Sequence, residues 1–220
     1  VDDGRRIGSV GGGEMESRVS EEAVDCLADG CSRLLDYRLV DPGAGDPGIC
    51  GGEVTIYLEP HMPPPTILVI GCGHVGRAVV DLASWLGFHV VATDDRFDVA
   101  EGLAEGLPGR SGVVVRPGAL ADVLADLRLA ADDHAVVVTR NVQVDVENLP
   151  HLLATEVGTV GVMGSQRRWD TARKSLLDAG VSETDLERVT SPVGIEIGAE
   201  TPEEIAVSIL AQVVDRQRTT

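Results

Sequence analysis

The sequence comprises 220 residues with a formal net charge of −18 at pH 7, and 43% of its residues are hydrophobic while only 3% are aromatic. This length fits one large domain, or a medium domain with a smaller one, around a core of aliphatic side chains. The acidic excess repels nucleic acid and anionic membranes, and no apolar run reaches the ~20 residues that span a bilayer. With no charged-then-apolar leader at its start, the chain is expected to be cytoplasmic. The acidity favours adaptation to salt, or a genome that replaces Lys with Arg, over an acidic partner-binding face.

Residues 1–59 are expected to form a small α+β domain. A helix is predicted over residues 17–28, ending at Gly30, with strands at 33–40 and at 53–59, where apolar and polar residues alternate. So short a segment makes a weak core. We therefore expect that further strands precede residue 1 in the complete protein and were lost by truncation or cleavage.

The four cysteines are interpreted as reduced thiols of a cytoplasmic protein. They lack the C-x-x-C spacing and the His pair of a zinc site, so no metal site is predicted. Cys26 and Cys31 lie on or near the predicted helix and are expected to be buried. Cys50 precedes Gly51 and Gly52, which leaves its thiol open to a ligand or partner, although a lone cysteine is more often inert than catalytic.

A proline-rich linker at residues 60–65 separates this domain from a larger one at 66–220, because three consecutive prolines form a stiff, extended connector. Strands and helices alternate in the larger domain, as in a Rossmann-type doubly wound parallel sheet. Strands are predicted at 66–70, 89–93, 112–116, 135–139 and 159–163. Helices are predicted at 74–86, 119–127, 146–154, 166–179 and 202–216, the last with a capping box of Thr201 and Glu204.

A glycine-rich turn follows the first of these strands. It reads Gly71-Cys72-Gly73-His74-Val75-Gly76 and has the G-x-G-x-x-G spacing between a strand and a helix. The first glycine permits a tight turn, the second lets a pyrophosphate approach the backbone, and the third lets helix and strand pack closely. We predict a phosphate-bearing ligand at this turn, against the alternative of a turn that serves packing alone.

Polar residues follow the other strands at the edge where α/β sheets bind ligands. Asp94, at the end of the second strand, is expected to accept hydrogen bonds from a ribose, and the acidic pair with Asp95 favours NAD over NADP. Arg96 would pair with a phosphate or an aspartate. Thr139 and Arg140 end the fourth strand. Ser165 and Arg167 follow the fifth, where a phosphate or carboxylate could bind, although Ser165 could simply cap the helix while Arg167 and Arg168 pair with surface acids.

A set of segments lies in one order along both domains. In the first domain they are residues 7–13 with Glu16, 49–52 and 59–60; in the second they are 71–75, 87–88, 94–96, 139–140, 161–168, 192–194 and 197–206. Together these segments resemble the xanthine dehydrogenase accessory family of the XdhC/CoxI type. The chain departs from the family at Glu14, where a Cys is common after the triple glycine, and at Val142 and Val144, where histidines are common. A thiol or imidazole role at these three positions is therefore not expected.

The resemblance implies a chaperone that binds the molybdenum cofactor (molybdopterin), helps it gain its terminal sulfur and delivers it to a xanthine or carbon monoxide dehydrogenase. The implied partners are the molybdenum hydroxylase apoenzyme and a cysteine desulfurase. The glycine turn, Arg140, Ser165 and Arg167 would surround the cofactor, with Cys50, Gly12 and Gly13 contributed by the first domain across a shared cleft. A homodimer would give the small domain a face to bury.

Two other functions stay open. One is an NAD-dependent oxidoreductase, against which the histidines are scattered along the sequence and form no acid–base pair with a substrate arginine. The other is a nucleotide-sensing regulatory domain, which needs binding but no chemistry.

Overall fold

A computed structural model of the chain describes residues 7–38, 52–107 and 109–217. The chain divides into two compact units, Val1–Pro63 and Pro64–Thr220. The division falls within the proline-rich segment, whose prolines favour neither a helix nor a central strand.

The first unit contains one helix and a two-stranded antiparallel sheet. Helix α1 spans Gly13–Asp29 and ends at Gly30, which adopts the left-handed conformation with φ of 67°. Strand β1 (Arg33–Arg38) pairs with β2 (Glu53–Leu58) in antiparallel register, and alternate residues of β2 are half-buried as its sequence pattern predicted. Cys26 is buried as expected, but Cys31 is exposed, because it follows the helix end instead of lying on its apolar face.

Helix α1 begins four residues before the predicted start. The sequence pattern placed the start after the triple glycine, since glycines disfavour helix. The Glu16 carboxylate, however, accepts a hydrogen bond of 3.0 Å from the Gly12 backbone N–H and so stabilises the helix start. Gly12 and Gly13 have φ of 78° and 65° and serve this local turn.

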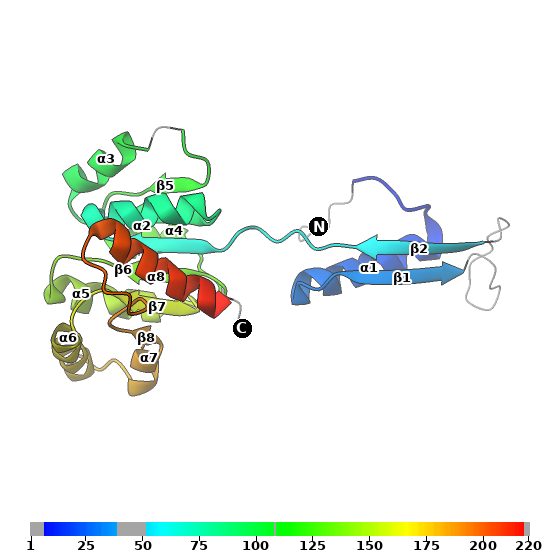
Figure 1. The fold of residues 1–220 in the computed structure, drawn as a ribbon. Coiled ribbons are helices and arrows are strands. Elements are labelled where there is room, and N and C mark those ends of the chain that lie inside the picture. The colour runs from blue at the N-terminus through cyan, green and yellow to red at the C-terminus, as the bar shows by residue number, and fades with distance from the viewer. Residues whose placement is uncertain (1–6, 39–51, 108, 218–220) are drawn as a thin grey trace. The chain divides into compact units, whose positions relative to one another are not determined.

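The second unit is built on a six-stranded parallel sheet with the Rossmann strand arrangement (Figure 1). Its order is β5-β4-β3-β6-β7-β8, so the chain starts in the middle, moves to one edge, and then returns to build the other half. The strands are β3 (Thr66–Ile70), β4 (His89–Thr93), β5 (Val113–Val115), β6 (His134–Val137), β7 (Thr159–Val162) and β8 (Val189–Thr190). The predicted fold class is confirmed.

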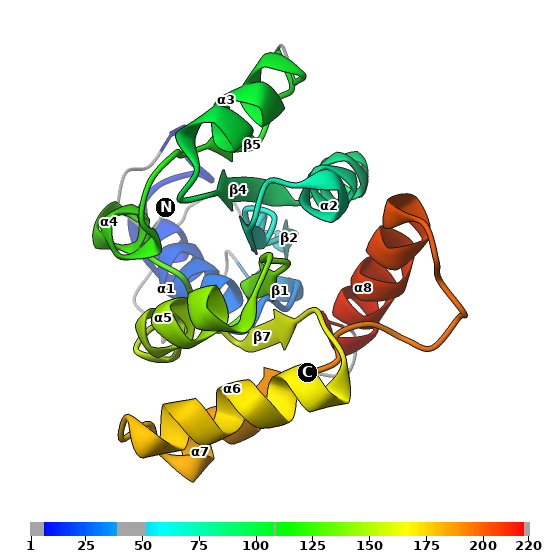
Figure 2. The ribbon, with the colours of Figure 1, turned by 90° about the vertical axis from the view of Figure 1, so that its left-hand side faces the viewer.

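Helices cover both faces of this sheet. One core packs Ile67, Val69 and Val90 against α2 (His74–Trp85), α3 (Phe97–Glu105) and α8 (Pro202–Gln217). The other packs the alternate strand residues, such as Leu68 and Val91, against α4 (Leu120–Asp126), α5 (Val142–Leu153), α6 (Gln166–Asp178) and α7 (Glu183–Glu187). Figure 2 shows α2 and α8 on one side of the sheet and α4 and α5 on the other.

In the second unit, the sequence pattern missed three elements and misplaced the start of one helix. Strand β8 and helix α7 are two and five residues long, too short to give a periodic pattern, and α3 lies in a segment for which no element was predicted. Helix α5 begins four residues early because the Asn141 side chain accepts the Val144 backbone N–H at 3.1 Å. The capping box of α8 is confirmed, with Thr201 N–H to Glu204 Oε2 at 3.0 Å and Glu204 N–H to Thr201 Oγ1 at 3.3 Å.

Candidate functional site

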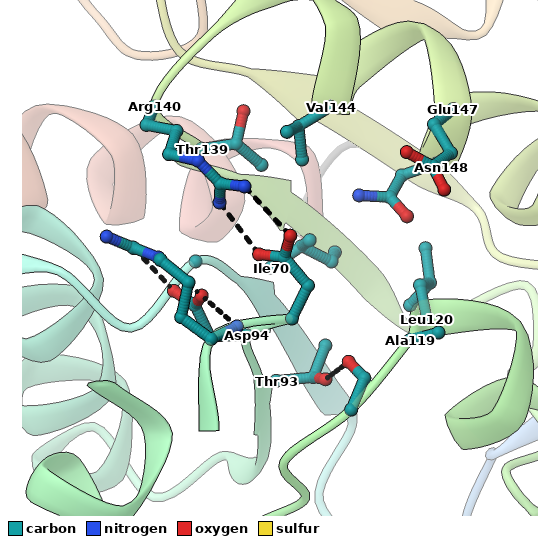
Figure 3. Close-up of a pocket in the computed structure, with 14 residues that line it drawn as sticks. Ile70, Thr93, Asp94, Ala119, Leu120, Thr139, Arg140, Val144, Glu147 and Asn148 are labelled. Atoms are coloured by element: carbon teal, nitrogen blue, oxygen red, sulfur yellow. Dashed lines mark hydrogen bonds and ion pairs between the residues drawn. The ribbon is translucent and has the colours of Figure 1, made fainter. Parts of the chain in front are cut away.

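A narrow pocket opens at the carboxyl edge of the six-stranded sheet (Figure 3). The strand order reverses between β3 and β6, and α/β sheets bind ligands in the crevice outside such a point. The pocket has a cavity volume of about 50 Å³, and its total empty space is about 480 Å³ when the open side is included. It is lined by Ile70, Gly71, Thr93, Asp94, Asp95, Arg96, Gly118, Ala119, Leu120, Thr139, Arg140, Val144, Glu147 and Asn148.

The three glycines of the turn beside this pocket have three different environments. Gly71 has φ of 111°, and a Cβ there would lie 2.7 Å from the Val138 carbonyl oxygen. At Gly76 a Cβ would lie 1.8 Å from the Gly71 carbonyl oxygen, so this glycine lets α2 pack on the turn. At Gly73 nothing lies within 4 Å of the point that a Cβ would occupy, so the absence of a side chain there serves no packing within the chain.

Helix α2 also begins without a side-chain cap. Gly73 is its N-cap residue, and the first intrahelical bond runs from the Arg77 N–H to the Gly73 carbonyl at 2.8 Å. The N–H groups of residues 74–76 precede that bond and point out of the helix end, where the helix dipole favours a negative charge. An open glycine and an uncapped helix start therefore coincide at the carboxyl edge.

Asp94 is buried and already holds several internal hydrogen bonds. Its Oδ2 accepts from the Cys72 N–H at 2.8 Å and from Arg96 Nη2 at 2.8 Å, and its Oδ1 accepts from the Arg96 N–H at 3.0 Å and Nε at 2.9 Å. These bonds tie the end of β4 to the glycine turn and raise the pKa of Arg96. A ribose could bind to Asp94 only by displacing part of this set.

Cys72 is buried beside Asp94, and burial first, then the Asp94 charge, raises the pKa of its thiol to about 12. The thiol is therefore neutral at physiological pH and a poor nucleophile.

Asp95 and Arg140 form a two-pronged ion pair at the pocket. Arg140 Nη1 and Nη2 donate to Asp95 Oδ1 and Oδ2 at 2.7 and 2.8 Å, joining the segments after β4 and β6 (Figure 3). The bond with Arg140 lowers the pKa of Asp95 to about 2. Their side chains are 49% and 40% exposed, and exposed pairs contribute only ~0–1 kcal/mol. Arg140 can therefore exchange Asp95 for an anionic ligand at low cost.

A buried charged network lies next to the pocket and includes Asp145, which the sequence analysis missed. Asp145 is fully buried. It accepts a hydrogen bond from the Thr139 hydroxyl, and its Oδ2 accepts from Arg168 Nε at 2.9 Å and Nη2 at 2.6 Å. Arg168 thus pairs with a buried acid, and not with either partner that the sequence left open, a bound anion or a surface acid. The two residues meet because they lie in the first turns of α6 and α5, which follow the neighbouring strands β7 and β6. The only sequence signal for Asp145 was its place in the first turn of a helix, where acidic side chains are favoured.

The structure brings some predicted residues together and leaves others apart. Gly71, Asp94, Arg96, Thr139 and Arg140 line one pocket. Ser165 caps α6, accepting the Arg168 N–H at 3.3 Å, and Arg167 is exposed; neither lines this pocket. Both nevertheless follow β7, at the same sheet edge.

The remaining predicted residues lie elsewhere. His74 is exposed and lines a groove between α2 and α8, while Val75 packs against the core. Gly12, Gly13 and the exposed Gly52 belong to the first unit, whose placement relative to the pocket is not defined. Cys50 and Gly51 lie outside the described residues, so the shared cleft stays a prediction.

Three polar side chains of the pocket were not anticipated: Thr93 at the end of β4, and Glu147 and Asn148 on α5. Within residues 7–38, 52–107 and 109–217, no cluster of three or more His, Cys, Asp or Glu side chains could hold a metal ion. No helix in that same part of the chain is long and apolar enough to cross a membrane.

Fold and site together define a Rossmann-type domain with a pocket at its topological switch point, the place where α/β sheets of this kind bind ligands. The family model of the XdhC Rossmann domain matches residues 67–213, and that of the XdhC and CoxI family matches residues 1–38. The chain therefore belongs to the XdhC family.

Three known proteins are similar to this chain. It is 32% identical over 213 residues to the uncharacterized protein YqeB of Escherichia coli, and 28% identical over 171 residues to a Bacillus subtilis protein named as a probable xanthine dehydrogenase subunit. The alignments cover 96% and 74% of this chain but only 38% and 46% of those relatives, so the chain spans less than half of their length. A crystal structure of a xanthine dehydrogenase from Bacillus halodurans has the same fold, with a TM-score of 0.59 and 22% identity over 99% of this chain and 84% of that one.

Proposed function

We propose that this chain is part of an accessory protein that binds the molybdenum cofactor and delivers it to a molybdenum hydroxylase of the xanthine or carbon monoxide dehydrogenase type. Membership of the XdhC family supports this proposal, as does the similarity to the Bacillus subtilis protein named as a probable xanthine dehydrogenase subunit. When bound, the organic cofactor supplies the molybdenum centre that the client hydroxylase needs. The part of this chain is to bind, orient and release it.

The observation that carries the proposal is the open glycine at an uncapped helix start. Gly73 has room for a ligand group, and the N–H groups of residues 74–76 precede the first intrahelical bond. Such a helix start binds phosphate through its N–H groups and dipole. The phosphate of molybdopterin, or of a dinucleotide form of it, fits this arrangement, with Arg140 turning from Asp95 to the anion.

Identification of the ligand that co-purifies with the chain tests the proposal. The chain is expressed in a host supplied with molybdate, and the small molecules released by denaturation are identified by mass spectrometry. We expect molybdopterin or a nucleotide derivative of it. Release of NAD alone, or of no pterin under conditions where an active molybdenum enzyme from the same host retains its own, would overturn it.

An NAD-dependent oxidoreductase is the second candidate, because the strand order is that of dinucleotide-binding domains. The bonding of Asp94 weighs against it, since both carboxylate oxygens are taken by Cys72 and Arg96. A nucleotide-sensing domain is the third. Titration with NAD and with AMP separates these candidates, since a sensor would bind a nucleotide without catalysing hydride transfer.

The sulfuration step, a cysteine desulfurase partner and a homodimer belong to the same proposal. Cys50 is the candidate thiol, and Ser165 and Arg167 are candidate ligands for the far end of the cofactor. Replacing Cys50 with Ala is expected to lower sulfur delivery to a molybdenum hydroxylase while leaving pterin binding at the glycine turn. Light scattering of the purified chain measures the dimer directly.

A further inference from the structure

Most polar side chains of the carboxyl-edge pocket are bonded to another part of the protein. Asp94 pairs with Arg96, Asp95 pairs with Arg140, and the Thr93 hydroxyl donates to the Gly118 carbonyl at 3.3 Å. Two side chains differ: among the described residues, neither the Glu147 carboxylate nor the Asn148 carboxamide has a hydrogen-bond or ion-pair partner, although both line the pocket.

These two side chains are neighbours on α5 and lie across the pocket from Arg140 (Figure 3). The lining of the pocket also includes the aliphatic side chains of Ile70, Leu120 and Val144. A narrow space with aliphatic walls and hydrogen-bonding groups at one end suits the edge of a planar ring.

The charges of the pocket identify the kind of ring edge. Three carboxylates (Asp94, Asp95 and Glu147) face two guanidinium groups (Arg96 and Arg140), so the pocket carries one net negative charge. The unpaired charge is that of Glu147, so this end attracts hydrogen-bond donors and repels anions.

A carboxylate accepts two parallel N–H bonds, and a neighbouring carboxamide donates to a carbonyl. A ring with an amino group, an adjacent ring N–H and an adjacent carbonyl presents that complement. We propose that Glu147 and Asn148 select a 2-amino-4-oxopyrimidine ring, the edge shared by guanine and by pterins. Adenine lacks the ring N–H and the carbonyl, and hypoxanthine lacks the amino group. This inference rests on the proposed function, since it assigns the ring-binding end of the same site.

Four phosphorylated ligands test the selection by isothermal titration: GMP, neopterin monophosphate, IMP and AMP. Because a hydrogen bond to a charged group is stronger than a neutral one, we expect GMP or neopterin monophosphate to bind at least ~10-fold more tightly than IMP and AMP. GMP binding alone identifies a guanine nucleotide as the source of the ring, and neopterin binding alone identifies a pterin. Equal affinity for AMP, or no binding of any ligand, overturns the inference.

Variants assign the selection to its residues. Glu147→Gln should lower the affinity for GMP or neopterin monophosphate to that for IMP. Asn148→Leu should also lower this affinity, without raising the affinity for AMP. Glu101→Gln, at an exposed position of α3, is the matched control and should change nothing. An unchanged ratio of GMP to IMP in Glu147→Gln overturns the inference. The two proposals can be contradicted separately. If the chain co-purifies with molybdopterin but Glu147→Gln leaves the ligand affinities unchanged, the proposed function stands and this inference is wrong. If the chain binds GMP selectively but never a pterin, the inference stands and the proposed function is wrong.

Discussion

At the scale of single residues, the glycines of the turn differ in whether packing within the chain requires them. A side chain at residue 76 would collide with the Gly71 carbonyl, whereas a side chain at residue 73 meets only open space. Gly73 also has an ordinary negative φ of −69°, so substitution there adds no backbone strain.

We therefore predict that Gly73→Val folds and that Gly76→Ala does not. The thermal midpoint of Gly73→Val should lie within a few degrees of the unsubstituted protein, because no atom has to move. Gly76→Ala should lose its cooperative transition, since a backbone carbonyl cannot retreat from 1.8 Å without shifting α2. Circular dichroism melting curves measure the thermal midpoints of both variants. A Gly73→Val protein that is unfolded at room temperature would contradict the packing argument.

The Asp95–Arg140 pair predicts a specific titration. The folded-state pKa of Asp95, about 2, lies below its ordinary value of 3.8, and the largest cause is the bond to Arg140. The contribution of the pair to stability is therefore complete above about pH 4 and is lost as the pH falls toward 2. Carboxyl ¹³C NMR should follow this titration, and Arg140→Met should raise the pKa of Asp95 toward 3.8. Arg110→Met, which breaks the distant pair with Asp81, is the control. An Asp95 pKa that ignores Arg140→Met would refute the assignment.

At the scale of elements, Arg168 joins α6 to the end of β6 and the start of α5. It pairs with the fully buried Asp145 and also reaches the Thr139 carbonyl at 3.3 Å. Because Thr139, Arg140 and Val144 line the pocket, this network holds one side of the site in place.

Arg168→Met should destabilise the protein by ~3–5 kcal/mol, because it leaves a buried carboxylate without its partner. Arg173→Met, on the same helix, breaks only an exposed pair with Glu183 and should cost ~0–1 kcal/mol. Urea denaturation of both variants gives the comparison. Equal losses would mean that the Asp145 network adds no more than a surface ion pair.

How far the sequence predicts the molecule also depends on scale. Strands β3 and β4 and the capping box of α8 follow from local pattern alone, because continuous apolar runs and cap residues act over a few neighbours. The early starts of α1 and α5 were not predicted. They depend on the side chains of Glu16 and Asn141, which accept hydrogen bonds from backbone N–H groups at the helix starts.

The site was predictable at its glycines and at its strand ends, whose position follows from parallel-sheet topology. The side chains that complete the site, and the pairs that its residues form, were not predictable from the sequence. Glu147 and Asn148 are brought to the pocket by the helix that follows β6, and no spacing in the sequence relates them to Asp94 or Arg140. The pairing of Asp94 with Arg96 likewise depends on side-chain geometry, not on pattern.

At the scale of the whole molecule, the charge of −18 predicts a strong dependence on salt. Acidic side chains that lack counter-ions repel one another and destabilise the compact state, and salt screens them over ~10 Å at 0.1 M. The thermal midpoint should therefore rise between low and molar sodium chloride. A flat or falling midpoint across that series counts against charge repulsion.

The central claim is that the glycine turn of this chain holds the phosphate of a pterin cofactor. The most direct test is the pterin content of the purified chain and of its Gly73→Val variant, both from a molybdate-supplied host, measured by fluorescence after oxidative release. The account predicts pterin in the unsubstituted protein and its loss from a Gly73→Val protein that is still folded, because the valine occupies the space left for the ligand. Equal pterin content in the two folded proteins, or none in the unsubstituted one, would contradict it.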